Sequence, residues 1–198
     1  MPVVRLLAMS GSARRDSWNR RALTVLAGGA ERAGAEVTLY EPREHPLPLY
    51  DGDLEASDGL PPAAARLQEL FAAHDGLLLA SPEYNGFFTP LVKNTLDWLS
   101  RPLPDGSGRA GTIHVRGKPA GIVSASPGAL GGIRSLQHTR QYLSNLGFLV
   151  VPEQAGVPRA DTLFAADGTL TDERLRRSVE AVGAAVATLA ARLRAAPA

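Results

Sequence analysis

The sequence predicts a three-layer α/β/α sandwich, in which helices cover both faces of a five-stranded parallel sheet. Three observations predict this fold class. Strand-like apolar runs alternate with helix-like amphipathic stretches along the whole chain, which is the pattern of parallel βα units. The apolar runs are nearly continuous, as in strands that are buried on both faces. The chain has 198 residues, 44% of them hydrophobic, which suits one domain with a substantial core.

The first βα unit shows the pattern most clearly. Val3–Met9 is an apolar run broken only by Arg5, and it predicts a buried strand that ends at the sequence SGS. A helix is expected over Ser17–Ala33, because Ser17 can cap it and small or apolar residues recur at helical spacing. Gly34 ends this helix, and Glu36–Tyr40 predicts a short second strand.

The rest of the chain repeats this pattern. Five strands in a chain of this length favour the flavodoxin-like doubly wound order 2-1-3-4-5, in a single domain over residues 1–198. The further strands are expected over Gly76–Ala80, Pro119–Ser124 and Phe148–Val151, and the further helices over Pro61–His74, Pro90–Ser100, Gly131–Leu146 and Thr171–Arg194.

Three connections are longer than usual: Glu41–Leu60, Arg101–Lys118 and Pro152–Leu170. Loops of this length are usually functional or disordered. Several prolines in two of them restrict the backbone, which favours order.

Composition and charge exclude several classes of function. The net charge is +1, so no broad field favours nucleic acid or an anionic membrane as a partner. The chain has no cysteine, which excludes disulfides and thiolate metal sites, and its four histidines lack metal-ligand spacing. No signal peptide or apolar stretch of roughly 20 residues is found, so a cytoplasmic location is expected.

The candidate site lies in the loops that follow the first, third and fourth strands. In an open parallel sheet, ligands bind outside the carboxyl ends of the strands, near the point where the strand order reverses. These loops read SGSARRDSWN, SPEYNGFF and SASPGALGG, and they are the stretches richest in Ser, Gly and Asn. Fold and composition therefore indicate the same edge of the sheet.

The first of these loops suits an anion. It leads into a helix N-terminus, where free amides and the helix dipole favour negative charge. Ser10, Ser12 and Ser17 add hydroxyl donors, Asn19 adds an amide, and Arg14 can grip a phosphate. The loop is neither a Walker A motif nor GxGxxG. Taken alone, it fits a capped helix with surface arginines equally well.

The loop after the third strand suits a planar, polar ring. Pro82 and Gly86 fix a turn, so that Glu83, Tyr84 and Asn85 are expected to project at the edge of the sheet. A heteroaromatic ring with carbonyl and N–H groups needs this mixture of donors, acceptors and stacking surface. A turn with a partly buried tyrosine explains the loop alone as well.

Together these motifs resemble a known family. GSARRDSWN is similar to the GSxRxxSxN phosphate loop of NADPH-dependent FMN reductases, a group that includes bacterial quinone, azo-dye and chromate reductases. SPEYNGFFTPLVKNTLDWLSRP resembles their isoalloxazine loop and the helix after it. The likeness includes LPLYDGDLE at 47–55 and SPGALGGIRSLQHTRQYLSNLG at 126–147, so it spans most of the chain.

The resemblance implies a set of FMN-binding residues. One group binds the phosphate, a second lines the flavin ring, and Ser126 approaches the pyrimidine side of that ring. The first group is Ser12, Arg14, Ser17 and Asn19, with Ser10 and Gly11 shaping the loop, and the second is Pro82, Glu83, Tyr84, Asn85 and Gly86.

The resemblance also implies an FMN-dependent NAD(P)H oxidoreductase. Hydride passes through bound FMN to a quinone, an azo compound, a metal oxyanion such as chromate, or free flavin, with no catalytic acid or base and no metal. A homodimer or homotetramer is implied, with Asp97 and Trp98 at a subunit contact. The sequence chooses neither the acceptor nor NADPH over NADH, although Arg15 and loop 101–118 are candidates for contact with a 2′-phosphate.

Two alternatives remain. One is a flavin reductase that supplies reduced FMN to a partner monooxygenase, and the other is a non-enzymatic flavodoxin-type electron carrier. The near-zero net charge argues against the carrier, because such proteins generally dock through acidic faces.

Overall fold

The sheet has five parallel strands in the order β2-β1-β3-β4-β5, which confirms the predicted topology. The computed structural model describes residues 3–195. The strands are β1 (Val4–Ser10), β2 (Ala35–Tyr40), β3 (Gly76–Ala80), β4 (Pro119–Ala125) and β5 (Leu149–Val157).

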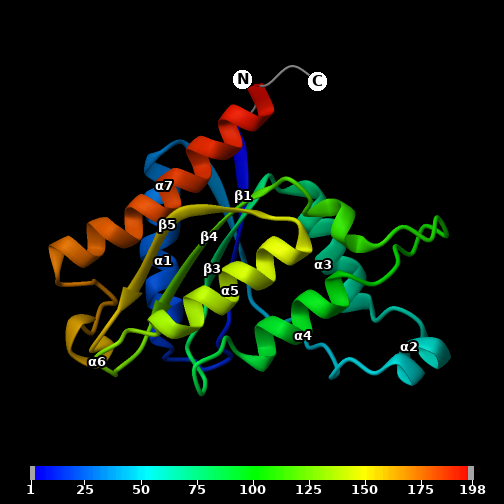
Figure 1. Cartoon of the computed structure of the whole chain (residues 1–198), viewed down its shortest axis with the longest axis horizontal. Helices are drawn as coiled ribbons and strands as arrows, with labels where there is room; N and C mark the ends of the chain where they lie inside the picture. The colour runs from blue at the N-terminus through cyan, green and yellow to red at the C-terminus, as the bar shows by residue number, and fades with distance from the viewer. Residues whose placement is uncertain (1–2, 196–198) are drawn as a thin grey trace.

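Helices cover both faces of the sheet, in three layers (Figure 1). On one face α1 (Trp18–Arg32) and α7 (Glu173–Ala195) bury a core rich in Ala, Val and Leu. On the other face lie α3 (Pro62–Ala73), α4 (Pro90–Leu99) and α5 (Ile133–Leu146). The three-layer prediction is therefore confirmed.

The central strands explain why the sheet lies between two layers. All five residues of β3 and all seven of β4 are buried, in keeping with their unbroken apolar sequences. Burial of each Leu or Val side chain contributes about 1.5–3 kcal/mol, and such a strand realises this only when both faces are covered.

The fifth strand is longer than its sequence indicates. Residues 152–157 were expected to begin a loop, but β5 continues through them to Val157. Proline cannot donate to a sheet ladder and is tolerated at an edge strand or a bulge. Pro152 meets both conditions. β5 is an edge strand, and the register between β5 and β4 shifts between the pairs Ala120–Val150 and Ile122–Gln154.

The long connections contain short helices that the sequence did not indicate. They are α2 (Gly52–Asp58), the 3-10 helix η1 (Gly111–His114) and α6 (Ala160–Leu163). Residues 41–60 and 158–170 follow β2 and β5, so they lie at the carboxyl edge of the sheet. Residues 101–118 connect the end of α4 to the start of β4, and this places them at the opposite edge.

The segment before α2 is held against α4. Trp98 Nε1 and Asn94 Nδ2 each donate to the carbonyl of Pro48 at 2.8 Å, and Arg101 Nε donates to the Glu55 carboxylate at 2.8 Å. The resemblance implied a subunit contact for Trp98, but its ring is wholly buried within the subunit. Trp98 therefore orders the 41–60 connection.

The two ends of the described chain lie at the edge opposite the carboxyl ends of the strands. Arg194, near the end of α7, donates to the carbonyl of Val3 at 2.8 Å and forms an ion pair with Asp75 at 2.8 Å. None of the helices within residues 3–195 is long and apolar enough to cross a membrane.

Candidate cofactor site

The loops after β1, β3 and β4 meet at one edge of the sheet, at the bottom of Figure 1. Backbone hydrogen bonds tie each loop to the next strand of the sheet. Gly11 N–H donates to Ala80 O at 2.8 Å, and Ser81 N–H donates to Val123 O at 3.1 Å. Gly11 fits because a Cβ there would lie 2.7 Å from both Ser81 Oγ and Val92 Cγ2.

The serines of the first loop accept backbone hydrogen bonds. Ser10 Oγ also donates to Ser12 O at 3.4 Å, whereas the hydroxyl protons of Ser12 and Ser17 remain available. Ser10 Oγ accepts from Ser12 N–H at 3.2 Å, and Ser12 Oγ accepts from Arg14 N–H at 3.4 Å. Ser17 caps α1 by accepting from Asn19 N–H at 3.2 Å. A hydroxyl that accepts in this way can still donate to an anion.

Free backbone amides accompany these hydroxyls. Several N–H groups around the start of α1 make no hydrogen bond to any protein group of residues 3–195. No acidic residue lies in the first turn of this 15-residue helix, so its positive dipole end is not neutralised there. These amides include those of Ala13, Arg15, Asp16 and Trp18.

Two of the four arginines nearby are already engaged. Arg20 Nη2 forms an ion pair with Glu41 at 2.8 Å, and Arg21 Nη1 donates to Ala165 O at 2.9 Å. Arg14 and Arg15 are exposed, and no carboxylate in the described part of the chain forms an ion pair with either. These two guanidinium groups are therefore the ones available to an anion.

Asn19 lies at the start of α1 but is directed towards β4. Its Nδ2 donates to Ala125 O at 2.8 Å, and its Oδ1 accepts from Ala125 N–H at 2.9 Å. The side chain is only 3% exposed. Asn19 therefore joins the first loop to the end of β4 and sets the distance between them.

The second loop ends in a two-residue hairpin. Tyr84 and Phe87 exchange both backbone hydrogen bonds, at 2.9 and 3.0 Å. Asn85 and Gly86 between them have φ values of 53° and 88°. Positive φ at both positions defines a type I′ turn, for which Asn-Gly is the favoured sequence. Tyr84 and Asn85 are exposed at the tip, as expected from the sequence.

Glu83 differs from the expectation that it projects beside Tyr84. Its carboxylate is turned towards α5, where Arg134 Nε donates to it at 2.7 Å and Ser135 N–H donates at 3.3 Å. The side chain is 7% exposed. A carboxylate at a helix N-terminus next to an arginine is stabilised there, so Glu83 fastens the hairpin to α5.

The third loop is bent back onto the end of β5. Ser126 N–H donates to Val157 O at 3.0 Å, and Ser126 Oγ accepts from Gly128 N–H at 3.1 Å. Gly131 has a φ of 59°, and a Cβ there would lie 2.7 Å from Pro158 N. Only glycine allows this close approach.

Three residues of α5 that were not among the expected site residues contact the second loop. Arg134 pairs with Glu83, His138 stacks on Phe87, and Tyr142 stacks on Phe88. Burial next to Asp97 raises the pKa of the Tyr142 phenol, which therefore stays protonated and donates to Asp97 Oδ1 at 3.1 Å. Arg134, His138 and Tyr142 are spaced four residues apart, so the sequence places them on one face of the helix. It does not show that this face contacts residues 83–88, which lie about fifty positions earlier.

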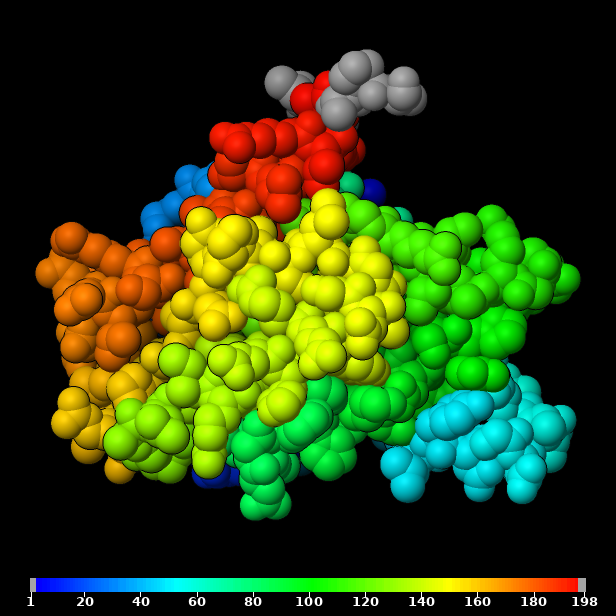
Figure 2. All heavy atoms as spheres, viewed as in Figure 1, coloured from blue at the N-terminus to red at the C-terminus, as the bar shows by residue number. Residues whose placement is uncertain are grey.

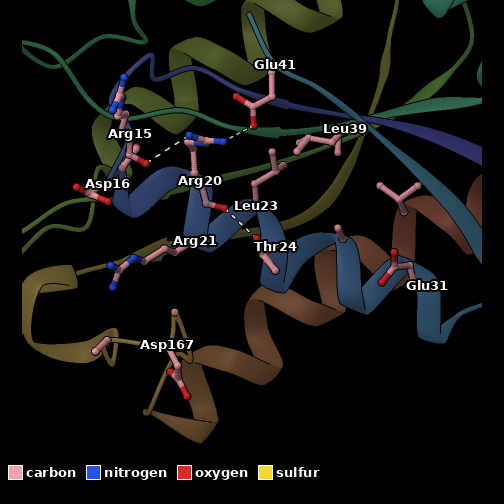
Figure 3. A pocket seen from close by; sticks show the side chains of 16 residues that line it. Arg15, Asp16, Arg20, Arg21, Leu23, Thr24, Glu31, Leu39, Glu41 and Asp167 are labelled. Carbon is pink, nitrogen blue, oxygen red and sulfur yellow. Dashed lines mark hydrogen bonds and ion pairs between the residues drawn. The ribbon is translucent and has the colours of Figure 1, made fainter. Parts of the chain in front are cut away.

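A hollow of about 550 Å³ lies beside the first loop rather than between the three loops. Figure 3 shows it on the side of α1 that faces Leu39 of β2, where Arg20 reaches Glu41 and the carbonyl of Arg15. It shares residues 15–17 with the first loop and continues along Leu23 and Leu39. Loop 101–118, a candidate for contact with a 2′-phosphate, lies at the other edge of the sheet, far from both.

These groups fit a flavin mononucleotide. The free amides, hydroxyls and two arginines at α1 form a donor set for a phosphate monoester. The rigid hairpin and the glycine-rich third loop offer backbone groups and ring surface beside it. Fold and site together define a flavodoxin-like protein with a place for a phosphorylated, planar cofactor.

Comparison with known proteins identifies the family. The sequence pattern of NADPH-dependent FMN reductases matches residues 4–162. An NAD(P)H-dependent FMN reductase of Pseudomonas aeruginosa is 36% identical over 179 residues, covering 89% of this chain and 90% of the relative. Probable NADPH:quinone oxidoreductase 1 of Oryza sativa subsp. japonica is 36% identical over 185 residues, covering 91% of this chain and 89% of that protein.

A solved structure agrees with these relatives. FerB, a flavoenzyme NAD(P)H:(acceptor) oxidoreductase from Paracoccus denitrificans, superimposes with a TM-score of 0.76 at 28% identity, covering 96% of this chain and 98% of FerB. The chain belongs to the NADPH-dependent FMN reductase family. It is an FMN-dependent NAD(P)H oxidoreductase, as the sequence predicted.

Proposed function

We propose that the loop after β1 holds the FMN phosphate. The observation that carries this is a set of amides at the start of α1 and two neighbouring arginines. Within residues 3–195, these amides have no hydrogen-bond partner and these arginines have no ion pair. Ser12 and Ser17 donate hydroxyl protons and Arg14 supplies the charge. Ser10 and Asn19 act indirectly, because their polar atoms already bond the backbone of the site.

The flavin ring is proposed to lie between the second and third loops. Tyr84, Asn85 and Gly86 form the tip of the hairpin. The amides of Asn85 and Gly86 have no hydrogen-bond partner within the described residues 3–195. Glu83 holds that tip against α5, Pro82 precedes it in the turn, and Ser126 is proposed to close the pyrimidine side. Hydrogen bonds to Glu83 and Ser126 fix these two loops before the cofactor arrives.

The reaction requires orientation rather than a protein acid or base. The chemistry that bound FMN supplies is a two-electron relay, in which NAD(P)H + H⁺ + quinone becomes NAD(P)⁺ + hydroquinone. The side chains of the second and third loops position the nicotinamide and then the acceptor against the same ring face, and they limit the access of water.

A quinone is the acceptor that we propose first. The rice relative is a probable NADPH:quinone oxidoreductase, and its similarity spans nearly all of this chain. Free flavin is the second candidate, because the Pseudomonas relative is an NAD(P)H-dependent FMN reductase at the same identity.

Association into a homodimer or homotetramer is also proposed. Large apolar side chains remain exposed near the site, among them Leu49 at 80% and Leu130 at 58%. Leu49 is held rigidly, since its neighbour Pro48 accepts two hydrogen bonds from α4. Light scattering coupled to gel filtration checks this, and a monomer at micromolar concentration would contradict it.

One experiment tests the main proposal. The purified protein is expected to be yellow, with flavin released on denaturation, and to oxidise NAD(P)H when a quinone is added. Initial rates with a quinone, free FMN and chromate, each with NADH and NADPH, rank the acceptors. A colourless protein that FMN does not reconstitute would refute the proposed cofactor site.

A further inference from the structure

Phe87 and His138 form a close ring stack at the edge of the proposed flavin site. Their ring centroids are 4.0 Å apart and their planes differ by 14°. Phe87 follows the Asn-Gly turn, and His138 lies one turn along α5 from Arg134, which holds Glu83. The ring of Phe87 is therefore covered on one side by an imidazole that belongs to a rigid helix.

Tyr84 is directed to the same side of the hairpin as Phe87. The two residues are direct partners in an antiparallel bridge, and partners of this kind project to the same face with Cβ atoms about 5 Å apart. Tyr84 is 48% exposed and Phe87 is 50% exposed. Two half-covered aromatic rings therefore stand side by side at the tip, which projects from the lower edge of the molecule in Figure 2.

The aromatic cluster continues into the protein and fixes this pair in place. Phe87 contacts Phe88 with centroids 5.5 Å apart, and Phe88 stacks on Tyr142 at 4.9 Å. Tyr142 in turn donates to Asp97 on α4. Because both α4 and α5 hold the cluster, the open part of Phe87 is a firm surface and not a mobile side chain.

We propose that Phe87, backed by His138, is a specificity-determining wall that selects planar aromatic acceptors. This inference rests on the proposed FMN site, because it requires the acceptor to bind beside the hairpin. An aromatic ring gains about 0.5–1.5 kcal/mol from stacking on another ring beyond the area it buries. A metal complex or oxyanion without a π face gains nothing comparable there.

His138 is a positioning residue in this arrangement. It contacts Phe87 and does not need to touch the acceptor. A flat side chain at position 138 should therefore replace it, whereas a small one should let the Phe87 ring rotate. The role depends on shape, so His138→Phe should behave like the parent protein.

The test compares two acceptors with the holoenzyme and saturating NADPH. One is 1,4-naphthoquinone, which is planar and aromatic, and the other is ferricyanide, which has no π face. The variants are Phe87→Ala, His138→Ala and His138→Phe, with Ile113→Ala as the control for loss of an exposed apolar side chain at the opposite edge. FMN affinity and the melting temperature of each variant are measured first.

Phe87→Ala is expected to raise the KM for 1,4-naphthoquinone about tenfold, with kcat and the KM for ferricyanide within twofold of the parent. His138→Ala should cause a smaller rise, and His138→Phe and Ile113→Ala none. Titration of the oxidised holoenzyme with 1,4-naphthoquinone, followed by flavin absorbance, should show the same tenfold loss of affinity without turnover.

Several results would overturn the inference. Equal changes in KM for both acceptors would show a general disturbance, and no change would show that the wall is not used. Dissociation of Phe87→Ala into smaller species in sedimentation would assign the ring to a subunit contact instead. A parent protein that binds no FMN would refute the proposed function itself, whereas normal FMN binding with unchanged quinone affinity would refute only this inference.

Discussion

Asn19 shows how one side chain can organise a binding site without occupying it. Its amide group bonds both backbone groups of Ala125, a residue 106 positions away. The same residue donates its own N–H to the cap Ser17. The loops that should receive FMN are therefore ordered in advance, which reduces the entropy that binding must overcome.

At the first loop, Arg14→Ala should weaken FMN binding by about 1.5–3 kcal/mol, or about 10- to 150-fold in Kd. The reason is that no carboxylate within residues 3–195 shares the charge of Arg14. Fluorescence titration of the apoprotein with FMN measures this. Arg192→Ala, at the far end of α7, is the control and should leave the Kd unchanged. Equal Kd values for parent and Arg14→Ala would refute the phosphate assignment.

Tyr40 makes the free energy of unfolding fall as the pH rises in the alkaline range. Burial raises the pKa of its phenol to about 12, and its hydroxyl is buried without a hydrogen-bond partner among residues 3–195. Between pH 10 and 12 the unfolded chain loses this proton while the folded chain keeps it. Stability is therefore complete below pH 10 and falls by up to about 1.4 kcal/mol per pH unit as pH rises through this window.

Tyr40→Phe should flatten this alkaline decline and leave stability at pH 7 unchanged or up to about 1 kcal/mol higher, because it removes an unsatisfied buried hydroxyl. Urea unfolding at pH 7, 10 and 11 checks both parts. A loss of more than about 1 kcal/mol at pH 7 would mean that the hydroxyl makes a stabilising contact.

Among the elements, the crossing of α1 and α7 depends on two glycines. A Cβ on Gly29 would lie 2.1 Å from Glu180 O, and a Cβ on Gly183 would lie 2.1 Å from Leu26 O. The helix backbones therefore approach as closely as they can. Both helices would have to move apart to admit even one methyl group.

Gly29→Ala should lower the free energy of unfolding by about 1–3 kcal/mol, the usual cost of overpacking. The adjacent Gly28 supplies the control, because the nearest atom to its added Cβ is Arg32 Nη1 at 3.4 Å. Gly28→Ala should stabilise by about 0.5–1 kcal/mol through higher helix propensity. Thermal unfolding distinguishes them, and two variants of equal stability would contradict the close crossing.

Elements whose own sequence shows a strong hydrophobic pattern were predictable. Elements that form only because a neighbouring strand pairs with them were not. β3 and β4 are unbroken apolar runs, so sequence alone places them within a residue of their ends. The second half of β5 carries Pro152 and exposed polar residues, and it is a strand only because β4 offers a ladder beside it. Tertiary pairing outweighed local propensity there.

The candidate site divides in the same way. Serine caps and an Asn-Gly turn are local signals, so their loops could be found from sequence. The direction of the Glu83 side chain depends on Arg134, fifty-one residues later. The Phe87–His138 stack likewise depends on how α5 lies against the hairpin, and this is a consequence of packing alone.

Across the whole molecule, the loops proposed to bind FMN lie at one edge of the sheet, and hydrogen bonds that join helices to strands lie at the other. The three site loops, with residues 41–60 and 158–170, lie at the carboxyl edge. At the opposite edge Lys118 donates to the carbonyls of Phe71 and His74 at 2.6 Å and closes the end of α3. Ligand binding should therefore stabilise one edge more than the other.

FMN at a hundred times its Kd should stabilise the folded protein by about 2.7 kcal/mol, which is a rise of about 5–10 °C in the melting temperature. Amide hydrogen exchange should slow at residues 11–19, 81–88 and 126–132 and remain unchanged at 101–118. Protection that is uniform along the chain, or greatest at 101–118, would place the ligand elsewhere.

The tie between Arg194 and Val3 has a practical consequence. It fixes both ends of the described chain at the edge of the sheet opposite the proposed flavin loops. A surface anchor fused at either end would attach the enzyme by this edge, which is opposite the proposed flavin loops, so these loops should face the solution. Immobilised in this orientation, the molecules should all present their reactive face to dissolved acceptor.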